Sequence, residues 1–468
     1  MYNRSKRLEP DEDELYNTAK KSKATKALGR LYLETINLKK LDFDLEKICS
    51  VTLSHLNVYC CLVCGKYLQG RGKESVAFLH AINDDHHVFI NTETLKVYVL
   101  PDNYEVNDFR YLDNIKYAIF PTFILQNGQN YSQKCYDLDN DSYISGFVPL
   151  NCVSGDSYAN VIIHAIAHIS PLRDYLLLKN KKDEYKDQLT QRLSVLVRRM
   201  WSPKLFRRHV SPYEFFQYLS ILSKDSKILK TLHHKKDPKD FLLWIFNHVL
   251  SSDKSSDFKE AITGNCRGEV SVSSTKVEEL TDESGKRLQF VEIHESKRSH
   301  ISKFWTLSLD LPPKPLFADG RNVNNWPQVK LIDLMKKFDG TKQIHSSNSV
   351  RTYKLTKLPS YLILHIDRFA HKMPMPVKNR NQAVVEFPLN MSIGGASYRL
   401  ICNIVHKALP SRNGSQEEDK DLSSEWKIQI LEPLSGDWYE FQDKSIRAKE
   451  KELLFLDESF LQVWEKIQ

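Results

Sequence analysis

The sequence lacks any apolar run long enough to cross a membrane, and its polar, charged N-terminus carries no signal-peptide pattern. These two absences predict a soluble, intracellular protein. A strong charge imbalance is also missing, because 67 basic and 59 acidic residues leave a net charge of +8. Such a mild excess permits acidic partners but does not indicate nucleic-acid binding.

Cysteine is scarce outside one short stretch. Of the eight cysteines, four lie between residues 49 and 64, and the others are scattered. A secreted disulfide framework would repeat its cysteine spacings along the chain, whereas a local Cys-x-x-Cys cluster near histidines indicates zinc. The composition therefore favours a metal site over disulfides.

The chain is too long for one ordinary domain. Its 468 residues, 41% of them hydrophobic, predict two or three domains with sizeable cores. Residues 1–40 are expected to form a polar, basic tail followed by a docking segment. The tail could instead be a nuclear-import or interaction segment, because it carries a basic group at Lys20, Lys21, Lys23 and Lys26.

Residues 49 to about 106 form the first predicted compact unit. Cys61 and Cys64 make a two-residue knuckle, His80 falls on a predicted helix over 75–82, and His86 follows it. Two thiolates and two imidazoles supply a tetrahedral structural zinc site, which would contribute roughly 10–16 kcal/mol of apparent binding energy. Alternatives stay open: Cys60 could replace Cys61, His87 could replace His86, and Cys49 and His55 could be extra ligands.

The second part of the chain changes its periodicity near residue 251. Helical spacing over 158–250 gives way to alternating strands, with an extended hairpin or loose insertion over 275–300 and a final helix over 457–466. Helices followed by strands predict an α+β fold.

Residues 45–106 resemble the zinc-finger ubiquitin-binding domain that accompanies many ubiquitin-specific proteases. In that family a pocket grips the free C-terminal Gly-Gly of ubiquitin with an arginine after a Cys-Gly pair and with aromatic side chains. Here Lys66 follows Cys64 and Gly65, and Tyr98 is present, but Leu100 stands where a second aromatic would help. Lysine lacks the planar fork that holds a carboxylate.

Residues 146–466 resemble the papain-like fold of ubiquitin-specific proteases, with a helical thumb and strand-rich fingers and palm. The phrases that carry the match are 146–166, 304–312, 358–369, 387–388, 398–406 and 438–443. By resemblance, the nucleophile position holds Ser157, the oxyanion position Cys152, the base position Glu425 and the orienting position Gln442. The family's paired finger knuckles are also missing, so the fingers are expected to lack zinc.

These replacements remove the expected chemistry. Glu425 cannot shuttle a proton near neutral pH as histidine does, and Gln442 cannot support an imidazolium. Ser157 is then explained as a helix N-cap. Two alternatives are weaker: Cys152 as a displaced nucleophile with His406 as its base, and Asp443 as a displaced orienting carboxylate.

A zinc finger joined to a protease domain without its triad resembles one branch of the family, the ubiquitin-specific-protease-like splicing factors associated with the tri-snRNP. The resemblance implies domains over 41–130 (zinc finger and connector) and 140–468 (inactive protease fold). It also implies a nuclear, non-catalytic splicing role with proteins of the spliceosomal small nuclear ribonucleoproteins as partners. Direct RNA contact stays open, and the alternative is a ubiquitin or ubiquitin-like isopeptidase or reader.

Overall fold

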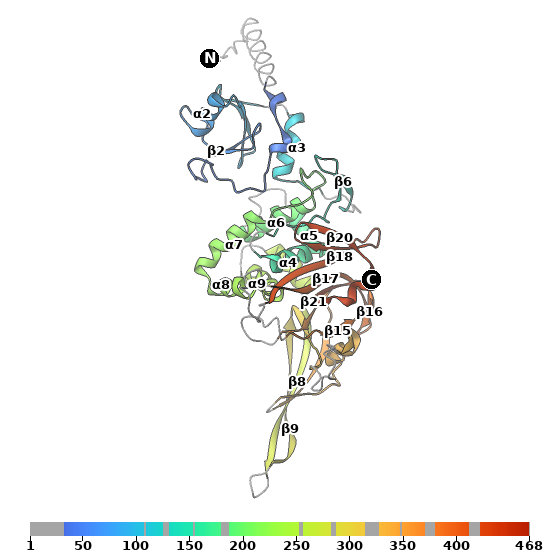
Figure 1. Cartoon of the computed structure of the whole chain (residues 1–468). Helices are drawn as coiled ribbons and strands as arrows, with labels where there is room; N and C mark the ends of the chain where they lie inside the picture. Colours follow the sequence, from blue (N-terminus) through green and yellow to red (C-terminus); the bar gives the residue numbers. More distant parts are fainter. Residues whose placement is uncertain are drawn as a thin grey trace, which may run out of the picture. The chain divides into compact units, whose positions relative to one another are not determined.

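The structure is a computed structural model and divides into two compact units (Figure 1). Unit 1 comprises residues 1–122, 133–145 and 202–208, and unit 2 comprises 123–132, 146–201 and 209–468. The structure describes residues 32–106, 109–124, 131–152, 155–178, 187–251, 256–281, 287–313, 327–346, 349–369, 380–410 and 422–467. The expected basic tail lies outside these ranges.

Unit 1 is built on a five-stranded antiparallel sheet in the order β2-β1-β3-β4-β5. Its strands are β1 (Val58–Cys61), β2 (Tyr67–Gln69), β3 (Val88–Asn91), β4 (Val97–Val99) and β5 (Tyr104–Glu105), beside a separate pair β6 (Lys134–Tyr136) and β7 (Ser142–Ile144). Its helices are α2 (Val76–Asn83), α3 (Phe109–Ile119) and the short turns η1 (Leu33–Thr35) and η2 (Leu38–Lys40).

Strand β1 separates two small cores, because successive side chains of a strand point to opposite faces. Val58 and Cys60 join Leu112 and Ile115 of α3 in one core, whereas Cys61 joins residues of α2 in the other. This alternation points Cys61, and not Cys60, toward α2. The helix predicted over 75–82 and the strand pair that follows it are confirmed by α2, β3 and β4.

Unit 2 begins with helices, as expected for residues 158–250. They are α4 (Ser157–His168), α5 (Ser170–Leu178), α6 (Gln188–Met200), α7 (Tyr213–Asp225), α8 (Lys227–Lys235), α9 (Pro238–Ser251) and α10 (Ser256–Cys266). In the part of the chain that the structure describes, no single helix is long and apolar enough to cross a membrane. Among the described helices, one bent pair, α4 and α5, meets the length and composition criterion when the two are taken together.

The strands of unit 2 form three sheets. The largest has the order β10-β14-β21-β17-β18-β19-β20, with β16 paired to β17, a second has the order β12-β13-β8-β9, and β11 pairs with β15. The bounds are β8 (Gly268–Thr281), β9 (Arg287–Phe304), β10 (Thr306–Asp310), β11 (Gln328–Lys330), β12 (Ile344–Ser346), β13 (Ser349–Lys357), β14 (Tyr361–Asp367), β15 (Val384–Glu386), β16 (Asn390–Ile393), β17 (Ala396–Pro410), β18 (Leu422–Leu431), β19 (Trp438–Gln442), β20 (Ser445–Lys449) and β21 (Glu458–Ile467). The remaining helical turns are α11 (Leu331–Met335), η4 (Lys336–Phe338) and η6 (Lys451–Leu456).

The helix predicted over 457–466 is wrong. These residues form β21, which pairs antiparallel with β14 on one side and β17 on the other. Because both faces of β21 are buried from Ser459 to Trp464, its side chains show no polar-apolar alternation. A short apolar run of this kind fits a buried strand as well as a buried helix, and only its neighbours decide.

Two features of unit 2 position the parts that matter for function. The extended hairpin expected over 275–300 is confirmed by β8 and β9, which pair along most of their length (Figure 1). Helix α4 packs against β18 and α9, and all its residues from Tyr158 to Ala167 are buried. The start of α4 therefore lies beside the sheet that carries Glu425.

Candidate functional site

Four metal-ligating side chains of unit 1 meet at one point. Cys61 ends β1, Cys64 lies in the turn after it, His80 projects from α2, and His86 lies in the loop before β3. One ligand atom from each lies within 4.8 Å of all the others. Cys64 Sγ is 3.4 Å and His86 Nδ1 is 3.0 Å from His80 Nε2.

The turn that presents the two cysteines depends on glycine. Gly65 donates its N–H to the Cys61 carbonyl (2.8 Å) and has a positive φ of 82°. A Cβ on Gly65 would lie 2.3 Å from the backbone oxygen of Lys40. The Cys-x-x-Cys-Gly spacing therefore brings both sulfurs to one side of a tight turn that leaves no room for a side chain.

The electrostatics of the cluster fit a cation. Asp84 Oδ2 lies 2.6 Å from His80 Nδ1, which fixes that ring with Nε2 toward the sulfurs. A hydrogen bond from the Cys61 thiol, opposed by burial, lowers the pKa of Cys64 to about 4, and the same bond and burial raise the pKa of Cys61. Two sulfurs and two imidazole nitrogens at this spacing match the donor set of a tetrahedral zinc site.

The alternative ligands have other contacts. His87 Nδ1 lies 2.7 Å from the Leu100 carbonyl oxygen and its Nε2 2.8 Å from Asp85 Oδ1, so both ring nitrogens are engaged. Cys60 is fully buried in the opposite core, and burial raises the pKa of its thiol. Among the described residues, neither Cys49 nor His55 joins the cluster.

Unit 1 also holds an arginine that the sequence analysis missed. The guanidinium of Arg71 lies 4.2 Å above the centre of the Tyr98 ring, and its Nη1 donates to Asn103 Oδ1 (2.5 Å). A guanidinium held flat on an aromatic ring can still present donors to a carboxylate. The only sequence signal was a Gly-Arg-Gly loop ahead of a strand with a tyrosine.

In unit 2, Ser157 occupies the first position of α4 and does not cap it. The N-cap residue is Asp156, and no side chain caps the helix. The Ser157 hydroxyl oxygen instead accepts the backbone N–H of Trp426 on β18 (3.3 Å). The N-cap assignment is therefore wrong, because a tertiary donor takes the oxygen that a cap would use.

The other two predicted triad positions are brought together on neighbouring strands. Gln442 Nε2, at the end of β19, donates to Glu425 Oε2 on β18 (2.6 Å). The residue after Gln442, Asp443, accepts the backbone N–H of Cys152 (2.7 Å). Polar side chains at this place thus bond to one another and to the loop ahead of α4.

His406 is not arranged as a base for Cys152. Its Nδ1 lies 3.2 Å from Glu458 Oε2 and its Nε2 3.0 Å from Ser424 Oγ, and its ring packs edge-on against Trp426. Burial lowers the pKa of His406, and burial likewise raises the pKa of Cys152. A neutral histidine and a protonated thiol are the opposite of an activated thiolate pair.

Comparison of the sequence with protein families explains both units. The family described as ubiquitin carboxyl-terminal hydrolase matches residues 150–463, and the zinc finger found in ubiquitin hydrolases and other proteins matches residues 49–110. The first match covers well over half of the chain, so the chain belongs to the ubiquitin carboxyl-terminal hydrolase family. The expected order, a zinc-finger domain followed by a ubiquitin-specific-protease fold of class α+β, is confirmed.

Within that family, the chain is similar to proteins named for splicing. It is 39% identical to the pre-mRNA-splicing factor SAD1 of Saccharomyces cerevisiae, over 97% of each chain. It is 37% identical to the probable mRNA-splicing protein ubp10 of Schizosaccharomyces pombe, over 93% of this chain and 88% of that one. A crystal structure described as an essential yeast splicing factor aligns with a TM-score of 0.77 at 36% identity, covering 93% of this chain and all of that one. The resemblance to the splicing branch is thereby confirmed.

Proposed function

We propose that this chain is a non-catalytic pre-mRNA splicing factor of the nucleus, which acts as a scaffold in the assembly or stability of the spliceosomal tri-snRNP. Two relatives that match 93–97% of the chain are named as splicing proteins, and their identities of 37–39% across both units support a shared role. Proteins of the small nuclear ribonucleoproteins are then its partners. In this proposal residues 1–40 form a tail and docking segment, 41–130 the zinc-finger domain with its connector, and 140–468 the inactive protease-like domain.

The observation that carries the loss of catalysis is the hydrogen bonding at the former catalytic positions. A serine hydroxyl at position 157 would need a strong base, and the side chain at the base position is Glu425, which accepts a hydrogen bond from Gln442. The Ser157 oxygen accepts the N–H of Trp426. We propose that this site has no isopeptidase activity, because it has neither an activated nucleophile nor a base.

We further propose that Cys61, Cys64, His80 and His86 hold one structural zinc ion. Two short elements and two loops of unit 1 converge on this cluster, so the ion would tie α2 and the Cys-x-x-Cys turn to the sheet. Metal binding of this kind adds directly to folding free energy. The ion has no part in any reaction step.

Two experiments test the main proposal. The full chain, added back to a splicing extract depleted of its own copy, should restore splicing of a reporter pre-mRNA, and an extract that stays inactive would contradict the splicing role. The purified chain should neither cleave a fluorogenic ubiquitin substrate nor react with a ubiquitin suicide probe. Turnover that disappears in Cys152→Ala or Ser157→Ala would show that the site is an enzyme after all.

A second candidate function, a ubiquitin reader, is favoured by Arg71 and Tyr98. A free C-terminal carboxylate could meet the guanidinium edge that the tyrosine ring supports. Titration of the full chain with free ubiquitin tests this, with Arg71→Ala as the variant and ubiquitin lacking its last two glycines as the control ligand. Binding that requires both the arginine and the glycines would establish the reader, and no binding by the wild-type chain would reject it.

A further inference from the structure

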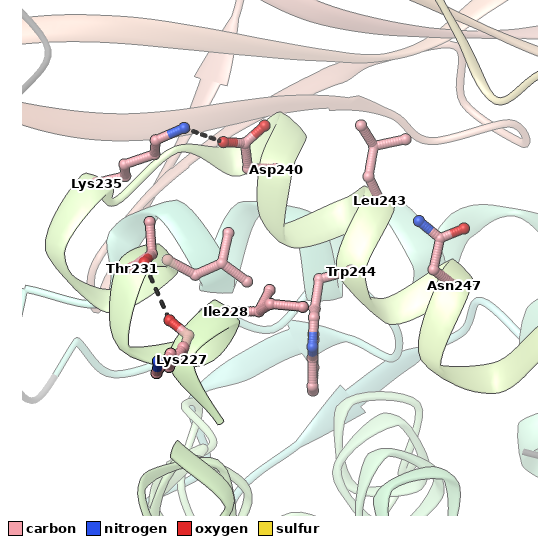
Figure 2. A pocket seen from close by; sticks show the side chains of 9 residues that line it. Lys227, Ile228, Thr231, Lys235, Asp240, Leu243, Trp244 and Asn247 are labelled. Carbon is pink, nitrogen blue, oxygen red and sulfur yellow. Dashed lines mark hydrogen bonds and ion pairs between the residues drawn. The ribbon is translucent and has the colours of Figure 1, made fainter. Parts of the chain in front are cut away.

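A groove in unit 2 belongs neither to the metal cluster nor to the former catalytic positions. It lies between α8 and α9 and has a volume of about 450 Å³ (Figure 2). Leu232 is buried beneath it, Leu243 and Trp244 are half-buried in its wall, and Ile228 is 65% exposed. Its lining is therefore mostly apolar and open to solvent, and its size is that of an ordinary ligand pocket.

The surroundings of the groove are basic. Residues 224–240 carry six lysines against three aspartates. Two of these aspartates are engaged: Asp237 accepts the N–H groups of the first turn of α9, and Asp240 pairs with Lys235 (2.9 Å). Across the residues that the structure describes, no carboxylate pairs with Lys224, Lys227 or Lys230. The lysines thus leave an unbalanced positive charge beside the groove.

Three polar groups of the groove lining, on Thr231, Lys235 and Asp240, are already bonded. The Thr231 hydroxyl donates to the Lys227 carbonyl (3.0 Å), and the Lys235 ammonium is held by Asp240 (Figure 2). A phosphate needs donors aimed at it, and this lining directs mainly carbon toward the space. An apolar side chain fits the groove better than a nucleotide does.

From these features we propose that the groove between α8 and α9 binds an acidic, amphipathic segment of a partner protein. A bulky apolar side chain of the segment fills the space beside Ile228, Leu243 and Trp244, and its carboxylates lie near the unpaired lysines. This is helix-in-groove recognition, with burial supplying affinity and charge supplying steering. This inference adds a binding site to the proposed scaffold role. It rests on the proposed function only in placing the partner protein within the splicing machinery.

Peptide binding to the full chain tests the proposal. The probe is a fluorescent peptide of about 14 residues, four helical turns, with Leu and Trp on one face and Glu on the other. Wild type should bind it saturably, and Ile228→Glu should weaken binding at least about tenfold, since it places charge on the apolar wall. Ile221→Glu is the matched control: it makes the same change at an exposed isoleucine of α7 that lies outside the groove lining, and should change affinity less than about threefold.

One further variant and a crosslinking experiment make the test of the proposal decisive. Thr231→Trp, which fills the groove from an exposed position, should also abolish binding if Ile228→Glu proves unstable. Absence of saturable binding, equal losses in Ile228→Glu and Ile221→Glu, or competition by single-stranded RNA would each overturn the proposal. A photoreactive residue at position 231, but not at position 221, should crosslink to an acidic protein segment in purified ribonucleoprotein particles. Crosslinks to RNA would contradict the proposal that the groove binds a protein segment. Absence of the chain from such particles would contradict the proposed splicing function, but the measured peptide binding would remain valid.

Discussion

Replacing Gly65 by alanine should damage the proposed zinc cluster without changing any of its four ligands. Gly65 has a φ of 82°, a left-handed conformation that costs an L-residue roughly 1–2 kcal/mol. The added Cβ would also lie 2.3 Å from the Lys40 oxygen, and this contact is to backbone, which cannot rotate away. Relieving such an overlap costs roughly 1–3 kcal/mol. Together the two terms predict a loss of about 2–5 kcal/mol in the unfolding free energy of unit 1.

Zinc release during urea unfolding measures this loss in the right unit, because the cluster lies in unit 1. A chelating dye reports the released ion, and Gly65→Ala should release it at a lower urea concentration. A loss of 2 kcal/mol corresponds to a factor of about 30 in the unfolding equilibrium constant.

Two glycines supply matched controls. Gly72 in the same unit has no positive φ and nothing within 4 Å of its added Cβ, so Gly72→Ala should leave zinc release unchanged or delay it slightly. Gly395 in unit 2 has nearly the same φ as Gly65 but open space around it, so Gly395→Ala should cost only the conformational term. The reasoning fails if Gly65→Ala and Gly72→Ala release zinc at the same urea concentration.

Three further outcomes are expected. Cys64→Ser should reduce the zinc content of the purified chain by one ion, measured by elemental analysis. Burial lowers the pKa of His164, and it lowers the pKa of His168 to about 4. Both imidazoles therefore stay neutral in the folded chain and gain protons on unfolding. The unfolding free energy should fall as the pH drops from about 6.5 toward 4, by about 3 kcal/mol for His168. Arg380→Met should cost about 2–4 kcal/mol of unfolding free energy, because Glu458 loses the two hydrogen bonds (2.7 and 2.8 Å) that help to keep its pKa at about 2.

Each of these has its own check. Cys49→Ser should keep the zinc content unchanged, and a loss equal to that of Cys64→Ser would contradict the ligand set. His168→Leu should flatten the pH dependence of urea unfolding above pH 4.5, and an unchanged slope would assign that dependence to other groups. Adding Glu458→Gln to Arg380→Met should recover part of the lost stability, since it removes the stranded charge; no recovery would show that packing and not charge is responsible.

Local sequence patterns were sufficient to predict secondary structure in unit 1, but they failed where tertiary contacts determine the secondary structure. The helix with His80 and the two strands after it could be predicted, because their periodicity and turn residues are contained within short stretches. The run over 457–466 could not, because β21 is covered on both faces and its alternation is lost. Likewise, no feature of the Gly-Arg-Gly loop tells that Arg71 lies on Tyr98, which is 27 positions further on.

The predicted catalytic positions show the same limit at single residues. The order of the motifs predicts that Ser157, Glu425 and Gln442 stand at the positions of the family's triad, yet their hydrogen-bond partners depend on how the strands pair. Ile428 pairs with Phe441 in the register of β18 and β19, which brings Gln442, at the end of β19, close to Glu425 on β18. Ser157 was predicted to be a helix N-cap because serine at a helix start favours that role. In the structure its hydroxyl oxygen instead accepts a hydrogen bond from the backbone N–H of Trp426, which is distant in sequence.

If the site is inactive as proposed, this placement explains how a protease fold can persist without its chemistry. The substituted positions are only partly buried, whereas the residues from Tyr158 to Ala167 that follow Ser157 are buried against the sheet and α9. A change at the start of α4 therefore costs little folding free energy, while a polar change within the helix would cost several kcal/mol. Because Glu425 and Gln442 satisfy each other, and Asp443 holds the loop at Cys152, the altered site needs no catalytic residue to remain folded. In the proposed function, loss of the triad removes an activity but leaves intact the surfaces, including the groove between α8 and α9, on which a scaffold would depend.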